Sequence, residues 1–145
     1  MSELILAPRR TAVVVNDIQK GIAGVPGAPH SASSVVANCA RLVAARESGT
    51  RPVLVHVGGS QDGRERLSPA VDQSAQGPAT LPPGWSDFVP DLGSHPRDIV
   101  ILKRQWGDFY GTHLDLQLRR RGLTTIVLCG IATEFGGGEH GLRCL

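Results

Sequence analysis

Four short apolar runs constrain the fold of this chain more than any other feature of its sequence. These runs are Thr11–Asn16, Pro52–Val57, Asp98–Lys103 and Thr124–Cys129. They are nearly continuous in apolar residues and lack the alternation of apolar and polar residues expected of a strand with one solvent-exposed face. Continuous apolar runs of this length are typical of strands buried on both faces, as in parallel sheets. We therefore expect parallel strands with helices covering both faces of the sheet.

The segments between these runs predict the covering helices. Ser31–Glu47 carries apolar residues at helical spacing and is followed by Gly49, and Ser31, Ser33 or Ser34 could cap it. A second helix is predicted over Thr112–Arg121. The long segment Gly58–Pro96 is polar and rich in Pro and Gly, and we expect one weak element in it near Trp85–Leu92. Alternating strands and helices predict a single α/β domain over residues 1–145, a three-layer α/β/α doubly wound parallel sheet.

Composition argues against several classes of function. A formal net charge of +2 is too small to indicate nucleic-acid binding, and Trp85 and Trp106 are not interleaved with a basic stripe. The basic run Arg119–Arg121 is more simply explained as a solvated helix end that complements the helix dipole. No apolar run approaches the length of a membrane span, so we expect no membrane partner. An odd number of cysteines without metal-binding spacing, and no signal peptide, indicate a cytoplasmic protein.

Chemically useful features follow three of the predicted strands at their carboxyl ends, where α/β enzymes bind ligands. Asp17 either caps a turn or acts as a general acid or base whose pKa is raised by apolar neighbours. Lys103 is either a surface lysine or a cation that orients Asp17 and stabilises developing negative charge. The turn Gly130–Gly136 follows the last strand. Three such features at one sheet edge favour a shared pocket.

Three motifs resemble those of the isochorismatase-like family, also called cysteine hydrolases. Asp17–Gln19 (Asp-Ile-Gln) is similar to the opening motif after a Val-rich first strand. Lys103–Leu114 is similar to the middle motif, in which a lysine precedes a Phe, a Gly-Thr pair and an apolar residue. Gly130–Phe135 (Gly-Ile-Ala-Thr-Glu-Phe) is similar to the third motif. Their order and spacing match over nearly the whole chain, so the resemblance implies this family's fold and a hydrolase acting on a small organic molecule; the family also includes nicotinamidases and other amidohydrolases.

The resemblance also implies a role for each matching residue. It makes Asp17 the carboxylate that handles protons and Lys103 its partner. It places a cis peptide bond between Ile131 and Ala132, which would turn backbone N–H groups toward a substrate oxygen, as in an oxyanion hole. The family's nucleophilic cysteine corresponds to Gly136 in the same turn, and glycine cannot attack a substrate.

We expect the substrate pocket to include further residues of the same motifs. Gln19 comes from the opening motif, and Trp106, Phe109 and Tyr110 of the middle motif indicate an aromatic lining. Family members that bind a metal use an Asp and a pair of His after the second strand. Here the corresponding segment has one histidine, His56, which we interpret as a core residue with a satisfied hydrogen bond. We therefore expect neither a metal nor another cofactor.

Without the cysteine, the expected reaction is one that needs no covalent step. In vinyl-ether hydrolases of the isochorismate type, a protonated Asp delivers a proton to the enol-ether carbon and water completes the reaction; Asp17 would serve here. Thioester or amide cleavage would need the missing sulfur, because Cys129 lies within the last strand and is interpreted as structural. The alternative is a catalytically inactive homologue that binds a small ligand or a protein partner. A nucleotide-binding module has little support, because no strand is followed by Gly-x-Gly-x-x-Gly.

The sequence after Phe135 departs from the family pattern. The family motif continues as Val-Glu-Ser-Thr-Ala into a helix and further elements, whereas Gly136–Leu145 reads Gly-Gly-Gly-Glu-His-Gly-Leu-Arg-Cys-Leu. A back-translation of this segment chosen to fit encodes Gly-Val-Glu-Ser-Thr-Ala in a shifted frame, so we expect a frameshift near Gly136 or Gly137 and a domain shortened on its C-terminal side. Such a domain leaves the Thr124–Cys129 strand with an unpaired edge, and we expect poor solubility or a homo-oligomer.

Overall fold

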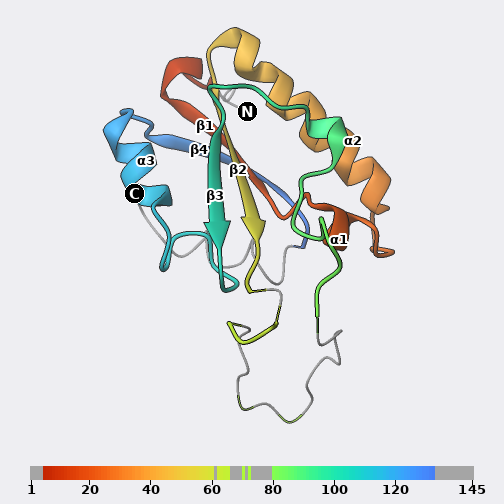
Figure 1. Cartoon of the computed structure of the whole chain (residues 1–145). Coiled ribbons are helices and arrows are strands. Elements are labelled where there is room, and N and C mark those ends of the chain that lie inside the picture. Colours follow the sequence, from red (N-terminus) through yellow and green to blue (C-terminus); the bar gives the residue numbers. More distant parts are fainter. Residues whose placement is uncertain (1–4, 61, 66–69, 71, 73–79, 133–145) are drawn as a thin grey trace.

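A four-stranded parallel sheet forms the centre of the molecule (Figure 1). The computed structural model describes residues 5–60, 62–65, 70, 72 and 80–132. Within these residues the strand order is β3-β2-β1-β4, so the chain moves outward from β1 to β3 and then crosses back to the other side of β1. This order confirms the predicted doubly wound fold class. The strands are β1 (Thr11–Asn16), β2 (Arg51–Val57), β3 (Ile99–Lys103) and β4 (Thr125–Gly130).

Helices cover both faces of this sheet, with α2 (Ala32–Ala44) on one side and α3 (Leu114–Arg120) on the other (Figure 1). Successive residues of β1 point to opposite faces and are all buried, which explains its unbroken apolar sequence. The shorter elements are η1 (Pro8–Arg10), α1 (Lys20–Ala23), η2 (Ala45–Ser48) and η3 (Pro90–Leu92). The α2 face buries Val13, Val15, Val36, Cys39 and Val43, and the α3 face buries Ala12, Val14, Leu114 and Leu118.

The helix boundaries follow the capping signals of the sequence. The Ser31 hydroxyl accepts a hydrogen bond from the backbone N–H of Ser34 at 3.2 Å, as expected of an N-cap. The predicted helix continues through the 3₁₀ turn η2 and ends at Gly49, whose φ is +96°. The helix predicted from Thr112 begins at Leu114, and the Thr112 hydroxyl accepts from the Leu114 N–H at 3.2 Å.

The described part of the long segment after β2 packs beside α1. The weak element expected there is the short helix η3, preceded by an isolated bridge between Gln19 and Phe88. Gly21 is in contact with Trp85, because a Cβ built on this glycine would lie 2.0 Å from the Trp85 Nε1 atom. This packing brings residues 85–88 to the carboxyl edge of the sheet. Among the described helices, none has the length and apolar character needed to cross a membrane.

Candidate active site

The sheet topology brings the predicted strand-end residues to one edge. Asp17 follows β1, Lys103 ends β3 and Gly130 ends β4. The register pairs Asn16 with Gly130 on one side and with Val55 on the other. The strand order changes direction between β1 and β4. Open α/β sheets bind ligands in the crevice at the carboxyl ends of the strands at such a switch point.

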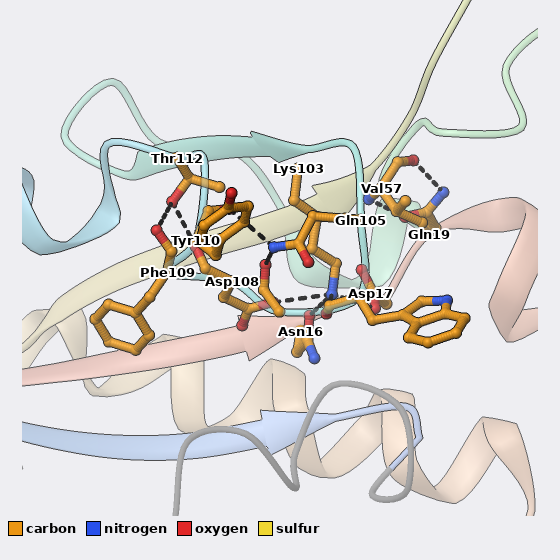
Figure 2. A network of polar contacts seen from close by, with 12 residues as sticks. Asn16, Asp17, Gln19, Val57, Lys103, Gln105, Asp108, Phe109, Tyr110 and Thr112 are labelled. Carbon is orange, nitrogen blue, oxygen red and sulfur yellow. Dashed lines mark hydrogen bonds and ion pairs between the residues drawn. The ribbon is translucent and has the colours of Figure 1, made fainter. Parts of the chain in front are cut away.

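Lys103 is the centre of a buried polar cluster at this edge (Figure 2). Its side chain is 1% exposed, and its Nζ lies 2.7 Å from Asp17 Oδ2 and 2.8 Å from Asp108 Oδ1. The same ammonium group donates to Asn16 Oδ1 at 2.8 Å and to the Trp106 carbonyl at 3.0 Å. One buried ammonium group is therefore shared by two carboxylates.

Asp17 is held in a conformation that few residue types adopt. Its φ is +56°, in the left-handed region that Asp tolerates better than most side chains, and its N–H donates to the Val55 carbonyl at 2.9 Å. Burial raises the pKa of the Asp17 carboxyl, although the neighbouring Lys103 ammonium acts in the opposite direction. Its Oδ1 is buried and has no hydrogen-bond partner within the described residues. Asp17 therefore combines a fixed position with a carboxyl group that retains its proton more readily than an exposed one.

The end of β4 passes very close to the end of β1. The Ile131 N–H donates to the Asn16 carbonyl at 3.1 Å. Gly130 has φ +142°, and a Cβ at this position would lie 2.0 Å from the Asn16 carbonyl oxygen, so only glycine fits. The cis peptide bond expected from the resemblance is present between Ile131 and Ala132. The oxyanion role of these two residues stays a prediction, and Gly136 lies outside the described residues.

The predicted pocket residues occupy different environments. Gln19 is fully buried, and its amide accepts from the Val57 N–H at 2.8 Å and donates to the Val57 carbonyl at 3.0 Å. Phe109 packs against the α3-side core, whereas Trp106 and Tyr110 are 53% and 71% exposed. Gln19 thus fixes the end of β2 beside Asp17, and a substrate contact by any of these four residues remains a prediction.

Two members of the cluster, Asn16 and Asp108, were not among the residues predicted from sequence. Asp108 is fully buried and lies five positions after Lys103 in the middle motif. A lysine that ends a buried strand needs compensation, and the nearby Asp was a usable signal. Asn16 looked like the polar end of an apolar run, and only the approach of Lys103 reveals its role as an acceptor.

His56 has the hydrogen bond predicted for it. Its Nδ1 lies 2.8 Å from the Ser86 carbonyl, and its ring centroid is 4.8 Å from that of Phe88. Across the part of the chain that the structure describes, no group of three His, Cys, Asp or Glu side chains is arranged to hold a metal ion.

The described cysteines, Cys39 and Cys129, belong to the α2-side core rather than to the Lys103 cluster. The Cys129 thiol donates to the Val14 carbonyl at 3.7 Å. A hydrogen bond with Cys39, together with burial, raises the pKa of the Cys129 thiol. This thiol therefore stays protonated, which supports the predicted structural role and makes it a poor nucleophile.

The chain is similar to known proteins over most of its length. An isochorismatase domain model matches residues 11–137. The chain is 50% identical over 135 residues to an uncharacterized isochorismatase family protein, YecD, of Escherichia coli O157:H7, covering 92% of this chain and 71% of that protein. It is 33% identical to the ureidoacrylate amidohydrolase RutB of Methylobacterium radiotolerans, covering 90% of this chain and 60% of that enzyme. The solved structure of an isochorismatase family protein from Burkholderia thailandensis matches with a TM-score of 0.83 and 44% identity, over 90% of this chain and 69% of that one.

Proposed function

The chain belongs to the isochorismatase family of hydrolases, and from this premise we propose that it hydrolyses a small organic molecule by acid–base catalysis at Asp17, without a covalent intermediate. The substrate class that fits this mechanism is a vinyl ether, an enol carbon joined through oxygen to a second carbon skeleton. Lys103 supports Asp17, and the β4 turn at Ile131 and Ala132 faces the substrate oxygen in this proposal.

The proposal rests on the hydrogen bonding and burial of the Asp17 carboxyl group. Its Oδ2 is bound to Lys103, while its buried Oδ1 has no partner among the described residues. Lys103 also pairs with the fully buried Asp108. Because burial raises the pKa of Asp17, its carboxyl group holds a proton more readily, and Oδ1 is the oxygen available to carry that proton. The group is thus suited to donate a proton to a substrate and to recover it.

The proposed reaction needs no reactant other than the substrate and water. Protonated Asp17 gives its proton to the terminal carbon of the enol ether, and the ether oxygen stabilises the resulting oxocarbenium ion. Asp17 is then a carboxylate paired with Lys103. A water molecule adds to the cationic carbon and loses a proton to Asp17, and the resulting hemiketal breaks into a ketone and an alcohol. The acid is regenerated, as a general acid–base catalyst requires.

The cysteines that the structure describes supply no suitable thiol, which favours this route over amide cleavage. The family nucleophile corresponds to Gly136, which has no side chain to attack a carbonyl carbon. Cys129 packs on the α2 side of the sheet with a raised pKa and is a poor substitute. We therefore take the similarity to the ureidoacrylate amidohydrolase to indicate a shared fold rather than a shared substrate.

A catalytically inactive homologue that binds a small ligand or a protein partner is the second candidate. Gly136 is the observation in its favour, because it removes the family nucleophile. In that case the Asp17–Lys103 pair would fix the shape of a binding site without supporting turnover.

Turnover of isochorismate, with simple amides as comparison substrates, tests the proposal. Asp17→Asn keeps the size of the side chain and removes its acid, so we expect kcat/KM to fall by about 10²–10⁴-fold. Asp115→Asn is the matched control, because Asp115 is a partly exposed residue of α3 paired with Arg119. Activity that survives in Asp17→Asn contradicts the acid–base role. Binding of isochorismate without turnover in the unmodified protein favours the inactive homologue.

A further inference from the structure

A concavity lies at the edge of the sheet opposite the Lys103 cluster, where the strands begin. It has a volume of about 400 Å³, and the charged side chains that line it are five arginines and Glu47. No step of the proposed reaction uses it. We call it the arginine pocket; its arginines are Arg9, Arg46, Arg51, Arg97 and Arg121.

The parallel topology explains why arginines distant in sequence converge here. All four strands start at this edge, so the segment before each strand contributes to the same surface. Arg9 lies in η1 just before β1, and Arg51 is the first residue of β2. Arg97 precedes β3, and Arg121 follows α3 on the way to β4.

Positive charge exceeds negative charge in the arginine pocket. Within the described part of the chain, Arg46 is the one lining arginine that has an ion-pair partner, with Nη1 3.1 Å from Asp98 Oδ2. Glu47 is the carboxylate in the lining itself, and the remaining lining arginines are Arg9, Arg51, Arg97 and Arg121. Charges of one sign gathered in a concavity focus the electrostatic potential and attract a ligand of the opposite sign.

Two of these guanidinium groups are already held in position. Arg51 Nη1 donates to the Arg97 carbonyl at 3.1 Å. Arg121 Nη1 donates to the Gln117 carbonyl at 3.2 Å and also to the Gln117 side-chain oxygen. These bonds use one nitrogen of each fork and leave other N–H donors for a ligand. Side chains that are positioned before binding lose less conformational entropy when a ligand arrives.

We propose that the arginine pocket binds a compact polyphosphate group. The planar guanidinium fork matches the oxygens of a phosphoryl group and can donate to them in pairs, and several arginines suit several linked phosphoryl groups. The volume of about 400 Å³ lies in the usual range for ligand pockets. Among the described lining residues, Leu123 is the only large apolar one, and none is an aromatic residue that could stack on a base. A nucleoside triphosphate is therefore expected to bind through its phosphates alone.

Calorimetric titration of the full chain with sodium tripolyphosphate, ATP and inorganic phosphate tests this proposal. Chloride is used to hold the ionic strength constant, because surface electrostatics are screened by salt. We expect tripolyphosphate and ATP to bind with similar affinity, and inorganic phosphate at least about tenfold more weakly because it engages fewer arginines. Tripolyphosphate that binds no more tightly than inorganic phosphate overturns the proposal. ATP that binds more than about tenfold more tightly than tripolyphosphate also does so, because a base-binding site would then dominate.

Paired variants locate the site. Arg9→Gln with Arg97→Gln removes two exposed guanidinium groups from the arginine pocket and should weaken tripolyphosphate binding at least about tenfold. Arg104→Gln with Arg119→Gln removes the same charge from arginines outside the pocket that pair with Glu65 and Asp115, and should leave the affinity within about twofold. Equal losses in the two double variants would mean that net charge alone drives binding, and the proposal would fail. Thermal melts confirm that both variants are folded before titration.

Discussion

Replacement of Lys103 by methionine probes the buried cluster most directly. The substitution keeps the length and apolar stem of the side chain but removes the ammonium that binds Asp17 at 2.7 Å and Asp108 at 2.8 Å. Both carboxylates are almost fully buried, with side chains 9% and 0% exposed, so water cannot replace the lost partner fully. Breaking a buried ion pair by removing one member costs about 3–5 kcal/mol. Because domains are typically stable by about 5–15 kcal/mol, we expect Lys103→Met to be close to its folding limit at neutral pH.

The size of this loss depends on pH, and the direction follows from Asp17. Burial raises the pKa of Asp17 above its ordinary value of 3.8, so the folded wild type binds this proton more tightly than the unfolded chain. Stability from this group is therefore greatest below pH 3.8 and falls as pH rises through the folded pKa. Loss of Lys103 removes an interaction that lowers the pKa of Asp17 in the folded protein. In the variant the stability from this group therefore continues to fall up to a higher pH. The stability difference between Lys103→Met and wild type should consequently widen as pH rises.

Urea unfolding followed by far-UV circular dichroism at several pH values measures this difference. Lys20→Met is the matched control, because Lys20 pairs with Asp87 at 3.1 Å but the two side chains are 52% and 59% exposed. An exposed pair of this kind contributes about 0–1 kcal/mol, so the control should unfold nearly like the wild type. A Lys103→Met variant within about 1 kcal/mol of the control, or a difference that narrows as pH rises, would refute the reasoning about buried charge.

Three other measurements test the fold and the site. Gly130→Ala should lower the melting temperature more than Gly111→Ala, because both have positive φ but only the Gly130 site lacks space for a Cβ; equal losses would contradict the close approach of β4 to β1. Leu118→Ala should cost about 2–5 kcal/mol by urea unfolding, because Leu118 is fully buried. Leu116→Ala, at a residue 53% exposed, should stay within about 0.5 kcal/mol of the wild type. For a vinyl-ether substrate, kcat/KM should fall as pH rises through the raised pKa of Asp17, since the reaction needs the protonated acid; a profile that rises over this range would contradict that role.

The sequence was sufficient for the sheet and for the two charged residues at its carboxyl edge. A strand buried on both faces needs apolar residues at every position, so runs such as Thr11–Asn16 are readable without a structure. Parallel strands also place their carboxyl ends together, so Asp17 and Lys103 could be expected at one edge. The motif resemblance predicted the cis bond between Ile131 and Ala132, which the structure contains. It also predicts that Gly136 stands at the position of the family nucleophile, and this stays a prediction.

Other site residues depended on tertiary packing. The substrate contact predicted for Gln19 from its place in a motif stays a prediction. The bonds of its amide to Val57 were not predicted, because they depend on how β2 ends beside β1. Asp108 is close to Lys103 in sequence, but the contact between them forms because the loop after β3 folds back over the sheet edge. Sequence spacing alone does not determine such a contact, because hydrogen bonds of loop side chains are set by three-dimensional proximity.

The arginine pocket, at the opposite edge of the sheet, also depends on tertiary packing. Its residues appeared in the sequence as isolated basic positions, and the run Arg119–Arg121 was read as a solvated helix end. In the folded chain Arg119 does pair on the helix surface with Asp115, but Arg121 turns to the same concavity as Arg9. The periodicity of apolar residues along the chain indicates which segments form strands and helices, because secondary structure depends largely on residues that are near one another in sequence. The charge of a surface depends on strand order and crossover packing, and therefore only the tertiary structure determines it.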